Sequence, residues 1–196
     1  MATQDRRVRK TRTQLKNALV TLLRVKSINE ITIQELVDEA DINRSTFYLH
    51  YTDIYDMLTS IEQEFFDAFL VVIDSQDDFE RVQNTGELHP NKTLSLLFNE
   101  IKKNTDICQV LMGPYGDVAF ISKMIYTIGE PLKRRVENLF KVNEHPDSEY
   151  IYNYCLFGCM GLIRRWFEEG LNKSSDEMAE MTAQLLISNM EYLNLP

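Results

Sequence analysis

The chain has 196 residues, 44% of them hydrophobic and 26% charged, which is enough apolar material for a globular core. No apolar run approaches the roughly 20 residues that span a bilayer, so we expect no membrane segment. The polar, basic N-terminus lacks the apolar stretch of a secretory signal, and we expect a cytoplasmic protein.

Motifs for catalysis or metal binding are missing from the sequence. It has three cysteines and three histidines, and no histidine stands at metal-ligand spacing to a cysteine. A Gly-rich phosphate loop, a G-x-S-x-G turn and an H-E-x-x-H pair are also absent. We therefore expect no enzyme, no metal and no other cofactor. Cys155 and Cys159 stand one helical turn apart; a thiol switch is one interpretation and two inert core cysteines are the other.

Positive charge is concentrated at the start of the chain. Residues 1–29 hold eight Lys and Arg residues and one acid, a net charge of +7, whereas the whole chain carries −9. The remainder therefore carries −16. This division favours a basic end that meets nucleic-acid phosphate and an acidic body with another role, with a solvated basic tail as the alternative.

Hydrophobic periodicity in the first part of the chain predicts helices. Residues 11–25 form one amphipathic helix, and two short helices follow over 33–39 and 44–50 with a tight turn at 40–42 between them. A longer helix begins near Asp53 and carries one continuous apolar stripe. The predicted caps are Thr32 with Glu35 in a capping box for the first short helix, and Asn43 for the second.

The rest of the chain predicts five further helices and no strand. Residues 74–91 look like a connection, and 113–116 form a turn. Pro131 is expected to kink or restart one helix. Ser148 can cap the penultimate helix, which Gly170 ends, and Ser174 with Glu177 forms a capping box for the last. The helices are expected over about 94–101, 107–112, from 117 past 128, 149–169 and 175–192, about nine in all.

The two short helices behind a basic helix are typical of a helix-turn-helix, whose second helix enters the major groove. The residues expected to pack between the helices are Leu36, Ile42 and Phe47, against Leu19, Leu22 and Leu58. The residues expected to face outward are Arg44, Ser45, Thr46, Tyr48, Leu49 and His50.

The segment from Ile31 to Tyr51 resembles the signature of the TetR/AcrR family of bacterial regulators. That signature has a Thr-initiated helix, an Ala-Gly-Val-like turn and a Thr-Phe-Tyr-x-His-Phe-like recognition helix. The matching residues are Thr32, Ile33, Ala40, Ile42, Thr46, Phe47, Tyr48, His50 and Tyr51, within an agreement over about residues 9–61. More loosely, residues 113–117 and 161–166 resemble the C-terminal domain of one low-GC Gram-positive branch.

The chain departs from the family signature at two positions. Asp41 replaces the usual turn glycine, and Asp tolerates a left-handed backbone better than most residues. Ile54 replaces a usual lysine that meets phosphate. We expect the backbone amides at the start of this helix, with Thr52 and Tyr55, to bind a phosphate instead, with weaker electrostatic affinity.

The resemblance implies DNA contacts. Arg44 has the reach for a bidentate contact to guanine, Thr46 could contact a base or a phosphate, and Arg9, Lys10 and Arg12 could reach the backbone or a minor groove. For each residue a solvated side chain is the alternative, and the Tyr51 ring could be half core. The DNA-binding set is Arg9, Arg12, Thr32, Arg44, Ser45, Thr46, Tyr48, Leu49, His50, Tyr51 and Thr52.

One short recognition helix reads few base pairs, so we expect a homodimer on two half-sites about 34 Å apart in a near-palindromic operator. The resemblance implies a four-helix bundle of the last two helices, although periodicity alone allows the same residues to fill the monomer core. The expected interface residues are Leu156, Phe157, Gly158, Gly161, Met178, Met181, Leu185 and Met190.

The resemblance also implies an effector site among the middle helices. The expected lining residues are Phe65, Phe69, Phe98, Met112, Tyr115, Phe120, Met124, Tyr152 and Trp166, with plain core as the alternative. Relatives with the looser C-terminal type include activators that respond to a protein partner, so small-molecule and protein effectors both stay open.

We therefore expect an all-α protein with a three-helix DNA-binding domain over 1–52 and a helical effector-binding and dimerisation domain over 53–196. The expected function is that of a sequence-specific transcription regulator that binds double-stranded DNA, a dimeric repressor released by a small-molecule effector. The alternative is an activator or a helical interaction module controlled by a protein partner.

Overall fold

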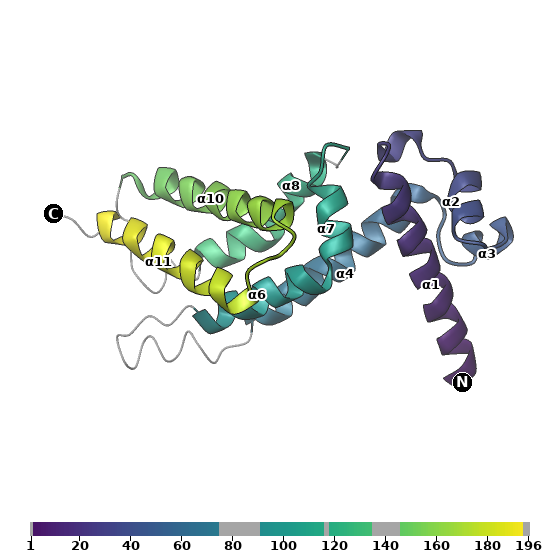
Figure 1. Ribbon diagram of the computed structural model, residues 1–196, viewed down its shortest axis with the longest axis horizontal. Helices are drawn as coiled ribbons and strands as arrows, with labels where there is room; N and C mark the ends of the chain where they lie inside the picture. The colour runs from purple at the N-terminus through teal and green to yellow at the C-terminus, as the bar shows by residue number, and fades with distance from the viewer. Residues whose placement is uncertain (1, 75–90, 116–117, 135–145, 194–196) are drawn as a thin grey trace. The chain divides into compact units, whose positions relative to one another are not determined.

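The computed structural model describes residues 2–74, 91–115, 118–134 and 146–193, and every regular element in these ranges is helical (Figure 1). The all-α prediction and the expected number of helices are confirmed for this part of the chain. The α-helices are α1 (Ala2–Leu23), α2 (Ile33–Glu39), α3 (Arg44–Tyr48), α4 (Ile54–Asp74), α6 (Asn91–Lys103), α7 (Thr105–Leu111), α8 (Val118–Met124), α10 (Ser148–Glu168) and α11 (Ser175–Leu193). A 3₁₀ turn, η1 (Ile28–Glu30), and a π-helical turn, η2 (Ile125–Gly129), complete the elements.

The chain forms two compact units. Unit 1 comprises residues 1–65 and 106–121, and unit 2 comprises 66–105 and 122–196. The division falls within α4, whereas the sequence suggested a functional boundary at residue 52. Most of the predicted 74–91 connection, and Gly116 with Asp117, lie outside the described residues. None of the described helices is both long enough and apolar enough to cross a membrane.

Unit 1 packs α1, α2, α3 and the first part of α4 around one core. α1 begins at Ala2, well before the expected start at residue 11, and ends at Leu23 rather than residue 25, so the basic arm is helical. Four of the six predicted core residues are buried, namely Leu19, Leu36, Phe47 and Leu58. The other two, Leu22 and Ile42, are half-buried.

The turn between α2 and α3 closes with a Schellman motif. The amide of Ile42 donates to the Val37 carbonyl over 3.1 Å, and the amide of Asp41 donates to the Asp38 carbonyl over 3.2 Å. Asp41 has φ of 51°, so it takes the left-handed conformation expected of it. The short polar side chain therefore supports the turn in place of glycine.

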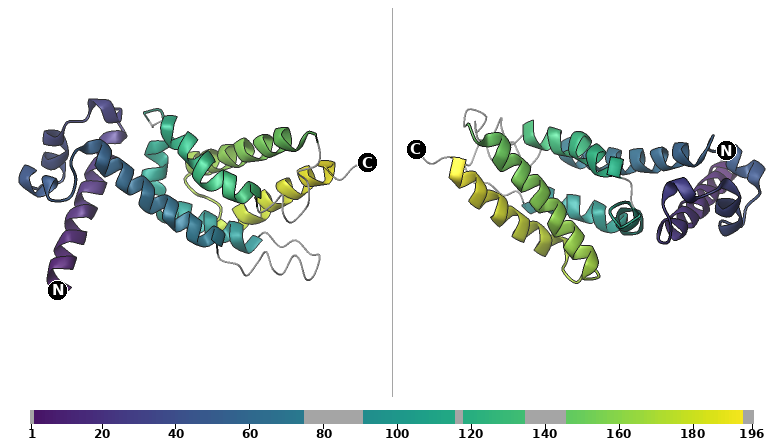
Figure 2. Two further views of the ribbon diagram at one scale, coloured as in Figure 1. Left: turned by 180° about the vertical axis from the view of Figure 1, so that it is seen from behind. Right: turned by 90° about the horizontal axis from the view of Figure 1, so that it is seen from above.

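Unit 2 contains an antiparallel hairpin of α10 and α11, with α11 also packed along α6; both views in Figure 2 show the two hairpin helices side by side. The Trp166 ring meets the Phe98 ring edge-on at 5.6 Å between centroids. The Trp166 Nε1 donates to the Lys173 carbonyl over 3.0 Å, which ties α10 to the loop that follows it. Trp166 and Phe98 are both buried, and they anchor this core.

The loop between α10 and α11 contains the predicted signals for the end of α10 and the start of α11. Gly170 has φ of 70°, and its amide donates to the Phe167 carbonyl, while the amide of Leu171 donates to the Trp166 carbonyl over 2.9 Å. The Ser174 amide donates to the Glu177 carboxylate over 2.7 Å, and the Glu177 amide donates to the Ser174 hydroxyl over 3.2 Å. The predicted capping box of the last helix is therefore confirmed.

The π-turn η2 lies just before Pro131, where the sequence predicted a kink or restart. Its Glu130 amide donates to the Ile125 carbonyl, five residues earlier, and the helix then continues through residue 134. A Cβ atom at Gly129 would lie 2.9 Å from the Tyr152 hydroxyl oxygen, so glycine lets α10 approach closely. Lys133 forms an ion pair with Glu149 and lies 5.0 Å above the centre of the Tyr152 ring.

Two predicted caps are corrected by the structure. Ser148 is the first residue of α10, and Asp147 takes the cap position without a side-chain cap bond. Asn43 does precede α3, but its side chain makes no cap bond either. α3 also ends at Tyr48 rather than at residue 50.

Candidate DNA-binding surface

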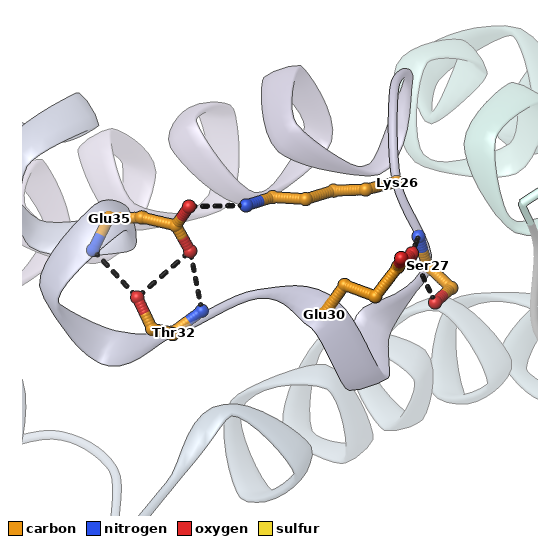
Figure 3. A network of polar contacts seen from close by, with 5 residues as sticks. All are labelled: Lys26, Ser27, Glu30, Thr32 and Glu35. Carbon is orange, nitrogen blue, oxygen red and sulfur yellow. Dashed lines mark hydrogen bonds and ion pairs between the residues drawn. The ribbon is translucent and has the colours of Figure 1, made fainter.

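Two capping boxes fix the approach to the helix-turn-helix (Figure 3). The Glu35 carboxylate accepts from the Thr32 amide at 2.9 Å, and the Thr32 hydroxyl accepts from the Glu35 amide at 3.2 Å. The Lys26 ammonium reaches the same carboxylate at 2.6 Å. The Ser27 amide donates to Glu30 over 2.9 Å in a second box that the sequence analysis overlooked, although its spacing is the same. These bonds hold the start of α2 to the loop behind α1.

Glu35, near the start of α2, makes the stability of the folded state depend on pH. The ion pair with Lys26, followed by the bonds from Thr32, lowers the pKa of Glu35 from 4.5 to about 2. The carboxylate therefore stabilises the folded state above pH 4.5, and the stabilisation is lost as pH falls toward 2. We expect Glu35→Gln to melt below the wild type at pH 6 and to approach it near pH 2.5 in thermal unfolding. A melting difference that does not depend on pH would contradict this assignment.

α3 exposes a pre-arranged pair of side chains. The Arg44 Nη2 donates to the Tyr48 hydroxyl over 3.2 Å, and the guanidinium carbon lies 5.7 Å from the centre of the Tyr48 ring. The Tyr48 ring in turn meets the buried Phe47 ring edge-on at 5.5 Å. Ser45 and Leu49 are also exposed, and the remaining two outward predictions, Thr46 and His50, are half-buried.

Arg12 and Tyr51 serve the fold of unit 1. The Tyr51 ring is buried, which fits the half-core alternative, and its hydroxyl accepts from Arg12 Nε over 3.1 Å. The Arg12 guanidinium also donates to Ser60 over 3.0 Å and to Glu64 over 2.6 Å. Arg12 therefore joins α1 to α4, and its guanidinium and the Tyr51 hydroxyl are bonded within unit 1.

The expected phosphate site at the start of α4 is corrected. The Thr52 amide and hydroxyl both donate to the Asp56 carboxylate, at 2.8 and 3.1 Å, and the Asp56 amide donates to Asp53 over 2.8 Å. The Tyr55 hydroxyl donates to Asn29 over 2.5 Å, and Ile54 is buried. Two carboxylates thus occupy the helix start and oppose a phosphate there. The Thr32 hydroxyl is likewise used within its capping box.

Removing one of these charges is expected to strengthen DNA binding. Asp56→Asn keeps an acceptor for Thr52 but removes a charge, so we expect operator affinity to rise about twofold to fivefold at low salt. The gain should vanish at high salt, as measured by fluorescence anisotropy across a salt series. Asp67→Asn is the matched control on the same helix, about 16 Å further along the axis, so its effect should be smaller throughout the salt series and absent at 0.1 M, where the Debye length is about 10 Å. An equal gain in the control would contradict a local effect.

Four exposed basic residues of unit 1 lie close together in sequence on α1. Arg6, Arg7, Arg9 and Lys10 are all exposed on this helix. Because the start of α4 is acidic, these four side chains are the best candidates for phosphate contacts.

The predicted effector residues are divided between the two units. Phe65, Met112, Tyr115 and Phe120 belong to unit 1, whereas Phe69, Phe98, Met124, Tyr152 and Trp166 belong to unit 2. Tyr115 is exposed, and the Phe65 and Phe120 rings contact each other at 5.9 Å as core residues do. An open pocket elsewhere in unit 2 is lined by none of the nine, but by Lys92, Ser95, Leu96, Asp176 and Glu180.

One face of α10 is left uncovered by the described residues of unit 2. Phe157 is 56% exposed, and added Cβ atoms at Gly158 and Gly161 would meet no atom within 4 Å. Tyr150 and Tyr154 continue this exposed stripe at helical spacing, a signal that the sequence analysis missed. We call these five residues the α10 face.

The other predicted interface residues divide among three environments. Leu185 is exposed on α11, and Leu156 and Met181 are half-buried. Met178 is buried, so it belongs to the core of unit 2 rather than to an interface. The Met190 side chain lies outside the described residues.

The cysteines are held as thiols. Burial raises the pKa of Cys159 to about 11 and that of Cys108 to about 12, and it also raises the pKa of Cys155. Raised values disfavour the reactive thiolate, which supports the interpretation as inert cysteines, although Cys159 is half-buried rather than a core residue. Among the side chains that the structure describes, no group of three or more His, Cys, Asp or Glu could hold a metal ion.

Comparisons with known proteins relate the chain to transcriptional regulators. A family model for the transcriptional regulator C-terminal region, TetR_C_8, matches residues 89–188, more than half of the chain. A curated relative, the uncharacterised HTH-type transcriptional regulator YxbF of Bacillus subtilis, is 36% identical over 64 residues. That match covers 29% of this chain and only 17% of the relative.

Solved structures share the fold at low sequence identity. A TetR transcriptional regulator from Streptococcus agalactiae has a TM-score of 0.58 at 18% identity and covers 94% of this chain and 98% of its own. The dihydroxyacetone kinase operon activator DhaS has a TM-score of 0.58 at 17% identity, and the match covers 93% of this chain and 97% of DhaS. FadR of Bacillus subtilis in complex with stearoyl-CoA has a TM-score of 0.57 at 13% identity, and the match covers 90% of this chain and 98% of FadR.

A helix-turn-helix with an exposed second helix, behind a basic first helix, defines a DNA-binding transcriptional regulator. Within that class, the chain belongs to the TetR family of transcriptional regulators. The predicted membership of the TetR family is thereby confirmed.

Proposed function

We propose that the chain is a sequence-specific repressor that binds a near-palindromic operator as a homodimer and is released by an effector. The exposed pair of Arg44 and Tyr48 on α3 is the observation that carries the proposal. A guanidinium held in place on a recognition helix loses less conformational freedom when it contacts a base edge. Phosphate contacts come from Arg6, Arg7, Arg9 and Lys10 on α1.

The α10 face supports the homodimer. Exposed aromatic rings beside two uncovered glycines suit close packing against a second helix, and aromatic residues are enriched at protein interfaces. A two-fold dimer presents two copies of α3, which match two half-sites of opposite orientation. Leu185 on the adjacent helix α11 adds exposed apolar surface.

Effector control would act through the spacing of the two recognition helices. An effector that binds more tightly to a dimer with the wrong spacing shifts the population away from DNA. The stearoyl-CoA held by a protein of the same fold supports a small-molecule effector with an apolar part.

An activator or interaction module controlled by a protein partner is the second candidate. The predicted effector residues that the structure describes are divided between the two units and pack largely as core, and DhaS, an operon activator, shares the fold. Transcription in vitro from the selected site separates the two candidates, because a repressor lowers the signal without any partner present.

Selection from a random duplex pool at moderate salt tests the proposed function. We expect an enriched near-palindrome whose affinity falls steeply with salt, because phosphate contacts release counterions. If no duplex is enriched even at low salt, the DNA-reading proposal is wrong.

A further inference from the structure

We infer that α3 reads a guanine and a thymine methyl group in each half-site, with Arg44 and Leu49 as the two base-reading residues. This inference rests on the proposed function and adds the chemistry of the bases recognised. Two features of the α3 surface support the inference. The Arg44 guanidinium is fixed by neighbouring side chains, and the large apolar side chain of Leu49 is exposed rather than packed in the core.

The first feature is a chain of contacts from the core to the surface. Phe47 is buried, the Tyr48 ring meets it edge-on at 5.5 Å, and the Arg44 guanidinium carbon lies 5.7 Å above the Tyr48 ring. The bond from Arg44 Nη2 to the Tyr48 hydroxyl, at 3.2 Å, fixes a second point of the side chain. Tyr48 is therefore a positioning residue for Arg44. Guanine presents two acceptors, O6 and N7, to such a planar fork in the major groove.

The second feature is the exposure of Leu49. This leucine directly follows the last residue of α3 and is 81% exposed. The other residues of α3 carry polar groups, except for the buried Phe47. An apolar side chain on a recognition helix has one apolar target among the base edges of the major groove, the C5-methyl group of thymine. The nearby Arg44 and the basic α1 favour DNA, rather than another protein, as the occupant of this surface.

The backbone sets where the two side chains leave α3. Leu49 keeps right-handed helical dihedral angles at the C-cap, so five helical steps separate it from Arg44. Five steps correspond to an axial rise of about 7.5 Å and leave the two side chains about 140° apart around the helix axis. We therefore expect Arg44 and Leu49 to contact different base pairs, on the two sides of α3 in the groove.

Base analogues test the inference on the full-length protein and the enriched duplex. Replacing the guanine with 7-deazaguanine removes the N7 acceptor and should weaken wild-type binding about tenfold. Replacing the thymine with uracil removes one methyl group and should weaken binding about fourfold. Arg44→Ala should lose sensitivity to the first analogue alone, and Leu49→Ala should lose sensitivity to the second alone.

Matched variants separate base reading from other roles. Val25→Ala removes another exposed apolar side chain of unit 1 and should keep the sensitivity to uracil. Tyr48→Phe should keep most of the preference for guanine over adenine, whereas Tyr48→Leu should reduce it, because only phenylalanine keeps the ring below the guanidinium. Far-UV circular dichroism verifies that each variant is folded.

Several outcomes would overturn the inference. An enriched operator that is insensitive to both analogues would overturn it and leave the proposed function standing. The Arg44→Ala variant could instead bind all DNA sequences equally more weakly, with the slope of log affinity against log salt concentration reduced by about one. That result would make Arg44 a phosphate contact rather than a base contact. Sensitivity to uracil that persists in Leu49→Ala would remove Leu49 from base reading. Absence of any enriched duplex would overturn the proposed function together with this inference.

Discussion

Phe157→Arg is expected to convert the proposed dimer into a monomer and to lower operator affinity by on the order of a hundredfold. The substitution places a charge in the α10 face, where a two-fold interface buries it twice without a partner. The monomer then binds one half-site and loses the gain from linked binding to the second. Sedimentation velocity at micromolar concentration measures the first effect, and anisotropy titrations with full and half operators measure the second.

Val71→Arg is the matched control for this experiment. Val71 is an apolar residue that is 71% exposed on α4, outside the α10 face, so the same change there should leave both mass and affinity unaltered. A Phe157→Arg protein that remains dimeric with wild-type affinity would show that α10 does not form the interface.

Trp166→Ala is expected to destabilise unit 2 by about 3 to 5 kcal/mol. The substitution removes a buried ring that meets Phe98 edge-on, and it also removes the bond from Nε1 to the Lys173 carbonyl. A loss of that size lowers the melting temperature by roughly 6 to 20 °C in a chain of this length. Thermal unfolding followed by far-UV circular dichroism measures it, since the chain has one tryptophan and the variant has none.

Two further variants check the cause of that loss. Trp166→Phe retains a ring against Phe98 but lacks the donor, so we expect a smaller loss of about 1 to 2 kcal/mol. Tyr126→Ala removes an aromatic ring that is exposed on η2 and should change stability little. If Trp166→Ala melts within 2 °C of the wild type, the ring does not anchor the core of unit 2.

Local sequence signals predicted the features that local contacts create. Thr32 and Glu35, or Ser174 and Glu177, lie three residues apart, so their spacing alone indicates a capping box. The left-handed backbone of Asp41 follows from its place in a tight turn. The cap of Thr52 with Asp56 spans only four residues, so the sequence contained that signal too.

Contacts between distant residues could not be predicted in this way. Arg12 bonds to Tyr51, Ser60 and Glu64 across 39 to 52 residues, and no local pattern distinguishes such an arginine from a solvated one. Periodicity likewise predicts which face of a helix is apolar, but not what that face packs against. It therefore grouped Met178, which lies in the core, with Phe157, which is exposed.

The π-turn at Ile125–Gly129 has a consequence for how this helix can change in evolution. A π-turn holds one residue more than an α-helical turn, so it corresponds to a single-residue insertion in a regular helix. Deletion of one residue would restore the regular helix and leave Gly129 beneath Tyr152 and Lys133 beside Glu149. Since the turn already absorbs the extra residue, the helix before it, including the buried Met124, would also keep its faces. The chain can thus gain or lose one residue at this turn while the residues that face the core on either side of it are inherited intact.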